Sequence, residues 1–559
     1  MADNQWVKCP SCDAFLYNKR LVRNLKVCPE CNHHLRLKVD ERLAQLLDDG
    51  AFEDLTDGVG SVDVLGFTDS KAYVDRLAES RQKTGRSDAA LYGRGAIGGH
   101  PVVVAAMDFS FMGGSMGAGV GEIVTRAAEL ALSSRTPLLV ISCSGGARMQ
   151  EGCVSLMQMA KTSQAFARLA EEGVLSICLN TDPTYGGVTA SFAMLGDVLI
   201  AEPAAMIGFA GPSVIEQTIR QQLPPGFQTS GFLLEHGMLD LVENREGLRN
   251  SLRKILAFHV ADRSAELPKT EGSAMVTDPD ELPVRPPWET VTLARDTMRP
   301  TTLEYAGYLF EDFVEFQGDR LFGENASIVG GPALLGSLPV VLIGHQKGHT
   351  TAEMVHRNFG MPEPEGYRKA LRLMHYAAKF GMPIITMVDT PGASPGLGAE
   401  ERGQGAAIAT CIMEMSRLPV PIVTVVTGEG GSGGALALAV ADRVLMMENS
   451  YYSVISPEGC STILFRSASA APRAAEALRI TGPDLLRLGV MDGVVSEPEG
   501  GAHRDPAQAA RNLKTAIVDC LAELLVLSPA ELLETRYQRY RAFGAPGVQP
   551  CITASKEPT

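Results

Sequence analysis

Four cysteines near the start of the chain have the spacing of metal ligands. They form two C-x2-C pairs separated by fifteen residues: Cys9, Cys12, Cys28 and Cys31. Four thiolates at this spacing can close a tetrahedral shell around Zn²⁺ and leave no open position, so we predict a structural zinc ribbon over residues 1–38. A redox disulfide pair or unpaired thiols are the alternatives. His33 and His34 follow closely, and we expect them to be exposed neighbours and not ligands.

A glycine cluster late in the chain is the second group of residues suited to chemistry. A β-branched run at 421–426 predicts a strand, and the alanine- and leucine-rich run Ala435–Ala441 predicts a buried helix. Gly433 and Gly434 lie between them. Without a Cβ the backbone can approach a ligand closely, and the first amides of a helix lack internal partners. Such amides suit a developing oxyanion, although a lone cluster could equally be a simple strand–helix turn.

The cluster is one of two copies. Gly186 and Gly187 follow a similar strand-like run and precede a similar stretch of small residues, which ends at Asp197 as the later one ends at Asp442. Gly433 follows Gly186 by 247 residues, and a second pair of landmarks has the same spacing. Those landmarks are Gly145 and Gly146 in the first half and Gly392 and Ala393 in the second. Two landmarks at one spacing predict two copies of one domain and not a short-period solenoid.

Bulk properties restrict the class of protein. At 559 residues the chain is long enough for two or more domains, and 45% apolar residues is ordinary for a globular protein. A net charge of −15 argues against a general nucleic-acid binder. No apolar run approaches the ~20 residues that span a bilayer, and the N-terminus has no signal-like segment. We therefore expect a soluble, cytoplasmic protein that contacts no membrane.

The regions between these landmarks predict the remaining organisation. Residues 40–92 have a mostly helical, polar pattern, and residues 264–288 are polar and proline-rich, as in an interdomain linker. A helical pattern follows over 505–543. Two stretches, 113–117 and 430–434, match the G-x-S-x-G motif of hydrolases. Nothing in the sequence links the downstream His503 to either serine, so a serine hydrolase is a minority hypothesis.

Longer motifs resemble a known family. The ribbon together with 144–151 (SGGARMQE), 181–188 (TDPTYGGV) and 207–212 (IGFAGP) is similar to the β subunit of the bacterial-type acetyl-CoA carboxylase carboxyltransferase. The second half is similar to its α subunit, through 344–348 (GHQKG), 358–362 (NFGMP), 364–373 (PEGYRKALRL), 389–393 (DTPGA), 398–404 (GAEERGQ) and 453–460 (SVISPEGC). The resemblance covers nearly the whole chain and indicates a β–α fusion.

The resemblance implies a fold and a reaction. It implies an α/β architecture of two tandem crotonase-like (ClpP/crotonase superfamily) domains behind the ribbon, with an active site between a β half and an α half of different protomers. The reaction is carboxyl transfer from carboxybiotin, on a separate biotin carboxyl carrier protein, to acetyl-CoA, giving malonyl-CoA for fatty acid synthesis. Biotin carboxylase is the further partner, and a homodimer equivalent to α2β2 is expected. The implied division is 1–38 (ribbon), 39–263 (β-like domain), 264–288 (linker), 289–545 (α-like domain) and 546–559 (disordered tail).

This chemistry needs two oxyanions to be stabilised, the thioester enolate and the ureido oxygen of biotin. We expect one set of backbone donors to hold the thioester oxygen: Gly145, Gly146, Gly186 and Gly187. We expect the other set to hold the biotin oxygen: Gly392, Ala393, Gly433 and Gly434. No side chain stands out as a general base, and the family is thought to use the biotin nitrogen. Alanine at Gly433 or Gly434 is expected to lower turnover with the fold retained.

The chain departs from the family at two places, and two alternative functions are compatible with parts of its sequence. The α-like half lacks most of the helical arm that usually precedes it, and His349 stands where the α subunit commonly carries Arg. A propionyl-CoA carboxylase or a decarboxylase is the second hypothesis, although the α/β division and the ribbon count against it. The third is a regulatory nucleic-acid binder. Residues 1–42 carry eight basic and five acidic side chains, and this small excess makes nucleic acid an unlikely partner.

Overall fold

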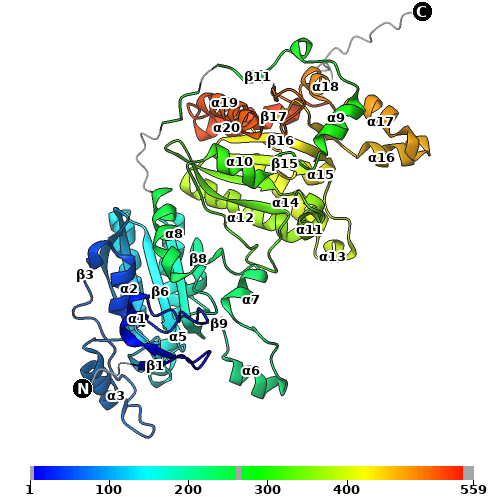
Figure 1. Ribbon diagram of the computed structural model, residues 1–559. Coiled ribbons are helices and arrows are strands. Elements are labelled where there is room, and N and C mark those ends of the chain that lie inside the picture. The colour runs from blue at the N-terminus through cyan, green and yellow to red at the C-terminus, as the bar shows by residue number, and fades with distance from the viewer. Residues whose placement is uncertain (1–5, 260–265, 271, 545–559) are drawn as a thin grey trace, which may run out of the picture. The chain divides into compact units, whose positions relative to one another are not determined.

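The computed structural model describes residues 6–259, 266–270 and 272–544. The predicted tail 546–559 and the predicted boundary at 263 lie outside these residues. The chain divides into two compact units, Met1–Val260 and Ala261–Thr559, which are described separately (Figure 1). Among the described residues, no helix has both the length and the apolar character to cross a bilayer.

The first unit begins with a small ribbon. Strand β1 (Trp6–Lys8) pairs antiparallel with β2 (Phe15–Tyr17), and helix α1 (Asn18–Arg23) follows. Two cysteines and two leucines form its small core: Cys9, Leu16, Leu21 and Cys28. So small a core supplies little hydrophobic stabilisation, which is why a ribbon of this size depends on a bound metal.

The rest of the first unit is built on one mixed sheet. Its strands, in spatial order, are β10 (Leu241–Val242), β8 (Val198–Ala201), β7 (Ser176–Tyr185), β6 (Leu138–Ser144), β5 (His100–Met107), β4 (Ala90–Ile97) and β3 (Glu53–Asp54), with β9 (Ile207–Gly208) beside β7. The strands from β5 to β10 are parallel, whereas β3, β4 and β5 are antiparallel. Strand β6 is buried along its whole length, which is why its sequence is almost continuously apolar.

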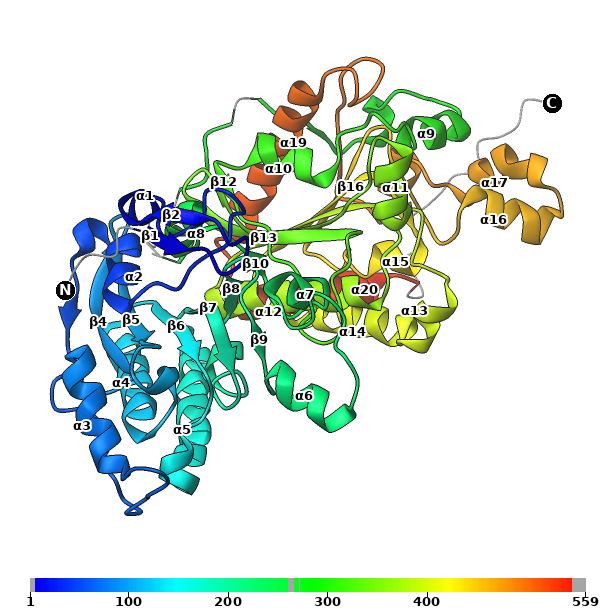
Figure 2. The ribbon, with the colours of Figure 1, turned by 60° about the horizontal axis from the view of Figure 1, so that its bottom comes forward.

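Helices cover the first sheet. Figure 2 shows α4 (Ala118–Ser134) and α5 (Gly152–Glu171) side by side, and α4 packs on β4, β5 and β6. The other elements of this unit are α2 (Val39–Leu46), η1 (Asp48–Gly50), α3 (Tyr73–Thr84), η2 (Met112–Gly114), η3 (Met149–Glu151), η4 (Phe192–Met194), α6 (Pro212–Ile219), α7 (Ser230–Glu235) and α8 (Arg245–Ala257).

The second unit repeats this sheet. Its strands, in spatial order, are β11 (Met275–Val276), β19 (Gly493–Val495), β17 (Arg443–Met447), β16 (Ile422–Gly431), β15 (Ile384–Thr390), β14 (Leu338–His345), β13 (Ile328–Leu335) and β12 (Asp312–Phe313), with β18 (Tyr451–Ser453) beside β16. Figure 1 shows α12 (Pro364–Phe380) and α14 (Gln404–Arg417) on one face of this sheet and α19 (Pro506–Leu524) on the other face.

Shorter helices complete the second unit. They are η5 (Pro279–Glu281), α9 (Pro287–Ala294), α10 (Thr302–Leu309), α11 (Thr351–His356), η6 (Asn358–Gly360), α13 (Leu397–Glu401), α15 (Ser432–Leu436), α16 (Pro457–Cys460), the π-helical η7 (Ser461–Phe465), η8 (Ala468–Ala470), α17 (Ala471–Leu478), α18 (Gly482–Arg487) and α20 (Pro529–Ala542). Together α19 and α20 confirm the helical pattern predicted for 505–543.

The structure confirms the duplication and corrects its register by one residue. Ser144 pairs with Thr184 between β6 and β7, and Thr390 pairs with Gly430 between β15 and β16. Thr390 therefore follows Ser144, and Gly430 follows Thr184, by 246 residues and not by the predicted 247. Gly186 is then equivalent to Ser432, and both have left-handed backbones, with φ of 63° and 55°. Matching glycine to glycine failed because a serine occupies this conformation in the second copy.

Two predictions of helix were too long. After Gly431 the helix α15 ends at Leu436, so the predicted helix Ala435–Ala441 is mostly a turn, and Gly186 is followed by turns and the short η4. The chain must return at once to the start of β16, where the Asp442 carboxylate accepts the amide of Ile422 (2.8 Å). Residues 40–92 are also less helical than predicted, because most of 47–72 is irregular.

The proline-rich stretch predicted as a linker contains elements of the second unit. Its β11 pairs antiparallel with β19 and so forms the edge of the second sheet. The amide of Glu266 donates to the Ser337 hydroxyl (3.0 Å), and Arg285 forms an ion pair with Glu448 (3.2 Å). These contacts join the stretch to the second unit by backbone and side-chain bonds.

A buried arginine joins the last helix to the sheet. Arg536 of α20 donates to both carboxylate oxygens of Asp442 (2.9 and 2.7 Å) and to three backbone carbonyls. Its side chain is fully buried. The same carboxylate holds the first residue of β16, as Asp197 holds Ser176 of β7 (2.9 Å). Arg536 thus neutralises a carboxylate that the strand needs.

Replacing Arg536 with methionine is expected to destabilise the second unit. Asp442 would stay buried without a counter-charge and three carbonyls would lose their donor, a loss of about 3–5 kcal/mol. Urea unfolding followed by circular dichroism measures the change. The exposed Arg541→Met, on the same helix, is the control and should stay within about 0.5 kcal/mol. Equal midpoints for the two variants would contradict the role given to Arg536.

Candidate active site

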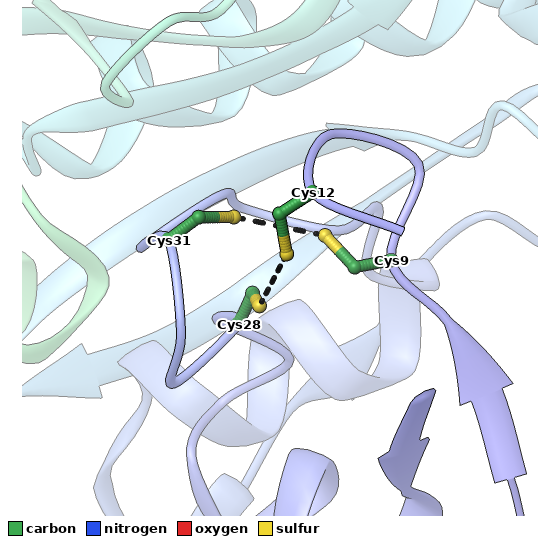
Figure 3. Close-up of side chains that lie close together, drawn as sticks. All are labelled: Cys9, Cys12, Cys28 and Cys31. Atoms are coloured by element: carbon green, nitrogen blue, oxygen red, sulfur yellow. Dashed lines mark hydrogen bonds between the residues drawn. The ribbon is translucent and has the colours of Figure 1, made fainter. Parts of the chain in front are cut away.

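The four predicted metal ligands lie together in the ribbon (Figure 3). Their sulfur atoms are all within 4.8 Å of one another, at 3.7 Å for Cys9–Cys31 and 3.8 Å for Cys12–Cys28. A tetrahedral site with Zn–S bonds of about 2.3 Å places its sulfurs about 3.8 Å apart. The cysteines therefore fit zinc without rearrangement, and these two pairs are too far apart for disulfide bonds.

Each cysteine pair lies in the same kind of turn. Asp13 donates its amide to the Cys9 carbonyl (3.1 Å), and Asn32 donates to the Cys28 carbonyl (2.9 Å). Asp13 and Asn32 have φ of 60° and 58°, a conformation that Asp and Asn adopt more readily than most residues. Both turns point the cysteine sulfurs toward one centre, which makes the site structural and closed.

His34 is buried, contrary to the prediction that it is exposed. Its Nδ1 lies 3.9 Å from Glu202, whose carboxylate binds Arg42 (2.6 Å) and Arg245 (2.7 Å). Burial alone would raise the pKa of Glu202, but the charges of Arg42 and Arg245 outweigh burial and hold it far below its usual range. Arg245 also donates to the carbonyl of Leu25 (2.8 Å). This network fastens the ribbon to the first sheet.

A second contact connects the ribbon to β7. Arg36 donates to the backbone carbonyl and the carboxylate of Asp182 (3.1 and 3.3 Å), and its guanidinium lies 3.9 Å from the centre of the Phe109 ring. Asp182 precedes Gly186 by four residues. The ribbon therefore contacts the strand that carries one of the predicted glycine pairs.

In the first unit the predicted glycines form two touching turns at the ends of β6 and β7. A Cβ on Gly186 would lie only 3.1 Å from the Gly146 Cα. The amide of Gly145 donates to Gly113 (2.9 Å), that of Gly146 to the Ser144 hydroxyl (3.0 Å) and that of Gly186 to Phe209 (3.0 Å). These three amides are occupied within the protein.

Two neighbouring amides are left over. In the part of the chain that the structure describes, the amides of Gly187 and Ala147 have no hydrogen-bond acceptor. A Cβ on Gly187 would lie 3.4 Å from the Cβ of Ala147, so the two residues are adjacent. The sequence pointed to Gly187 and missed Ala147, because only the register of the turn shows that the free donor follows the two glycines.

The second unit has the same arrangement. Thr390 accepts the amide of Gly392 (3.1 Å), as Ser144 accepts that of Gly146. In the described chain the amide of Ala393 has no acceptor, and Gly433 is the second residue of α15, where helix amides lack partners. A Cβ on Gly434 would lie 2.4 Å from the Ala393 nitrogen, so Gly434 is where the two turns meet.

A fully buried arginine fixes the first turn. Arg148 follows Ala147 and donates to Asp88 (2.7 Å) and to the Ser115 carbonyl (2.8 Å). Burial alone would raise the pKa of Asp88, but the charge of Arg148 outweighs burial and lowers it. The Arg148 amide itself donates to the Met116 carbonyl (2.8 Å). With both its backbone and its side chain held, Arg148 keeps the preceding amide in place.

The serines of the two G-x-S-x-G motifs have other partners or none. Ser115 accepts a hydrogen bond from Arg148 (3.1 Å). His503 lies 3.7 Å from Asp296, and no hydrogen bond among the described residues joins it to Ser115 or Ser432. The serine-hydrolase hypothesis therefore has no geometric support.

Comparisons with known proteins agree with this geometry. The family described as acetyl co-enzyme A carboxylase carboxyltransferase-like matches residues 250–544, and the acetyl-CoA carboxylase zinc finger domain matches 6–31. The carboxyl transferase subunits beta/alpha of Saccharopolyspora erythraea are 56% identical over 542 residues, covering 97% of this chain and 95% of that protein. Those of Salinispora tropica are 53% identical, covering 97% of each.

The chain belongs to the acetyl-CoA carboxylase carboxyl transferases. The match to fused beta/alpha subunits confirms the predicted β–α fusion and the predicted transferase class. The alpha subunit of Thermus thermophilus is 60% identical over 259 residues, covering 46% of this chain and 82% of that subunit. This shorter relative agrees with an α-like second half.

Solved structures confirm the tandem crotonase-like fold. A transcarboxylase 12S structure matches with a TM-score of 0.70 at 22% identity, covering 88% of this chain and 90% of that one. A single-chain, multi-domain long-chain acyl-CoA carboxylase matches with a TM-score of 0.66 at 18% identity, covering 86% and 46%. The family and the four clustered cysteines together confirm the predicted structural zinc.

His349, which stands where the resemblance leads us to expect Arg, bridges two acceptors. Its Nδ1 lies 2.6 Å from the Thr297 carbonyl and its Nε2 2.9 Å from the Glu304 carboxylate. Both nitrogens must carry hydrogen to satisfy both partners, so the bridge needs the imidazolium. The hydrogen bond to Thr297 raises the pKa of His349, partial burial opposes this, and Glu304 adds to the rise.

The His349 bridge predicts a pH-dependent stability. Because its pKa is raised on folding, the stabilisation is complete below the unfolded pKa of about 6.5 and is lost as pH rises through the folded pKa. His349→Arg keeps the charge throughout. The melting temperature of the wild type should therefore fall relative to that of His349→Arg between pH 6 and pH 9, as calorimetry at several pH values can show. A constant difference would mean that His349 does not bridge as a cation.

Proposed function

We propose that this transferase moves the carboxyl group of carboxybiotin, carried on a separate biotin carboxyl carrier protein, to acetyl-CoA and releases malonyl-CoA. The observation that carries the proposal is the pair of unsatisfied amides that recurs in the same register in both units. Ala147 with Gly187 form one pair, and Ala393 with Gly433 form the other. An enzyme with two oxyanions to stabilise needs two such pairs.

The two pairs match the two charges of the reaction. The C–N bond of carboxybiotin breaks and leaves negative charge on the ureido oxygen. The methyl group of acetyl-CoA loses a proton to the biotin nitrogen, and the resulting enolate carbon bonds to the released carboxyl carbon. We assign the thioester oxygen to Ala147 and Gly187, and the ureido oxygen to Ala393 and Gly433. Backbone donors are fixed before the charge develops, so no reorganisation is needed.

The other predicted residues have supporting parts in this proposal. Gly145, Gly146, Gly186 and Gly392 shape the turns, since their amides donate inside the protein. Gly434 gives the room that lets the α15 turn approach Ala393. This division narrows the eight predicted donors to three, Gly187, Ala393 and Gly433, and adds Ala147 as the fourth.

We propose a homodimer equivalent to α2β2, with biotin carboxylase and the carrier protein as partners. Support comes from the match of the whole chain to fused beta/alpha subunits. Four free thiolates in a zinc ribbon require a reducing compartment, which favours the cytoplasm. Light scattering on the purified chain should give twice the monomer mass of 59.6 kDa, and a stable monomer would contradict the proposal.

The reverse reaction tests the function directly. Purified protein is mixed with malonyl-CoA and biocytin, and acetyl-CoA formation is followed, with methylmalonyl-CoA in a parallel reaction. Biotin-dependent turnover of malonyl-CoA is expected. Loss of the carboxyl group without biotin would indicate a decarboxylase, and preference for methylmalonyl-CoA would move the enzyme to the propionyl class.

Gly433→Ala tests the second pair of amides in the same assay. Its Cβ would lie 3.9 Å from Ile408, an ordinary van der Waals distance, so the fold should survive while the ligand's approach is blocked. We expect turnover to fall about 10²–10³-fold, the usual effect of losing one oxyanion donor. Gly307→Ala, exposed on α10 with no atom within 4 Å of its Cβ, is the control. Gly434→Ala is not a clean test, because its Cβ would collide with the Ala393 nitrogen.

A further inference from the structure

A buried lysine in the second unit binds two carboxylates that the proposed chemistry does not use. The Lys347 ammonium lies 2.7 Å from Asp389 and 2.8 Å from Glu429, and only 14% of its side chain is exposed. Burial would lower the pKa of Lys347, but the two carboxylates outweigh burial and raise it. The lysine therefore stays charged and links two acids that would otherwise repel each other.

Both carboxylates lie at strand ends that carry the second pair of amides. Asp389 is in β15, four residues before Ala393, and Glu429 is in β16, four residues before Gly433. The Asp389 carboxylate also accepts the amide of Glu429 (2.9 Å). The cluster therefore joins the two strand ends that precede the two donors.

Further side chains extend the cluster to neighbouring elements. Glu429 accepts hydrogen bonds from Arg295, at the end of α9, and from the Tyr451 hydroxyl of β18, both at 2.7 Å. Arg295 also pairs with Glu458 of α16 (2.5 Å). Lys347 is thus the inner member of a network that joins β15, β16 and β18 to Arg295 after α9 and to α16.

The duplication shows that the network is not a requirement of the fold. At the 246-residue offset, Asp389 corresponds to Cys143 and Glu429 to Pro183, so the first unit has no acids at these positions. Cys143 instead donates to the Asp182 carbonyl (3.2 Å). The same pair of strands is therefore built without two acids bridged by a lysine, and the cluster belongs to what the second unit does alone.

The cluster faces a cavity and is not sealed in the core. Lys347, Asp389, Glu429 and Arg295 line a cavity of about 340 Å³, and Pro391, which precedes Gly392, forms part of its wall. A change in the cluster would therefore be transmitted to the turn and to the space beside it.

We propose that Lys347 is a positioning residue for the biotin half-site, because its ammonium holds Asp389 and Glu429 together and so sets the spacing of the Ala393 and Gly433 amides. The inference rests on the proposed assignment of the second pair to the biotin oxygen. Lys347 itself need not touch the substrate.

Steady-state kinetics of the reverse reaction test this role, with biocytin and malonyl-CoA varied separately. For Lys347→Met we expect kcat/KM for biocytin to fall at least 10-fold while KM for malonyl-CoA stays within 2-fold. Lys347→Arg keeps the charge on a longer, forked group, so it should recover most of the loss but retain a raised KM for biocytin. Lys514→Met, which removes another ion-paired lysine of the second unit, should leave both constants unchanged.

The outcomes separate the inference from the proposed function. If the wild type shows no biotin-dependent turnover, both the proposed function and the positioning role of Lys347 are overturned. Suppose that the wild type is active and Gly433→Ala is impaired. If Lys347→Met then has normal kinetics, or if its kcat/KM falls equally for biocytin and malonyl-CoA, only the positioning role is overturned. If Lys347→Met does not fold, Lys347→Arg decides: wild-type constants for both substrates would reduce Lys347 to a purely structural residue.

Discussion

A backbone amide can stabilise a developing oxyanion only if the protein leaves it unpaired while pairing everything around it. Unpaired amides are costly when water is excluded, and they are found where the surrounding structure leaves them no alternative. In each unit, two adjacent parallel strands end side by side, and the chain turns sharply after each of them. A hydroxyl, from Ser144 or Thr390, occupies the amide before the free one. The free donors therefore result from how the neighbouring amides are satisfied.

The two units hold the same turns by different means. The first uses the buried guanidinium of Arg148, which reaches Asp88 from within the turn itself, and the ribbon adds Arg36 against Asp182. The second uses Lys347 between Asp389 and Glu429. After the duplication the strands kept their register while the charged supports diverged. Such divergence is expected when two copies of one scaffold come to bind chemically different groups.

Local signals in the sequence predicted much of the fold and pointed to three of the four proposed donors. Cysteine spacing identified the metal ligands because each pair needs only its own turn, and the glycine repeats located the strand ends. Ala147 was not predicted, because an alanine in the sequence does not indicate an unpaired amide. The one-residue error in register arose because Ser432, and not a glycine, is the equivalent of Gly186. The Arg536–Asp442 and Arg42–Glu202 pairs join residues far apart in the chain. The local sequence around each of these residues does not predict its distant partner.

The edge strand β11 bears on how such a fusion can arise or be divided. Because Met275 and Val276 pair with β19, the stretch between the two halves contributes backbone hydrogen bonds to the second sheet. A gene split downstream of these codons would leave that sheet with an open edge, and exposed edges invite pairing with other chains. A functional break between the two halves must therefore fall upstream of residue 275. The proline-rich stretch has the composition of a linker, but its strand β11 is part of the second of the two domains that it connects.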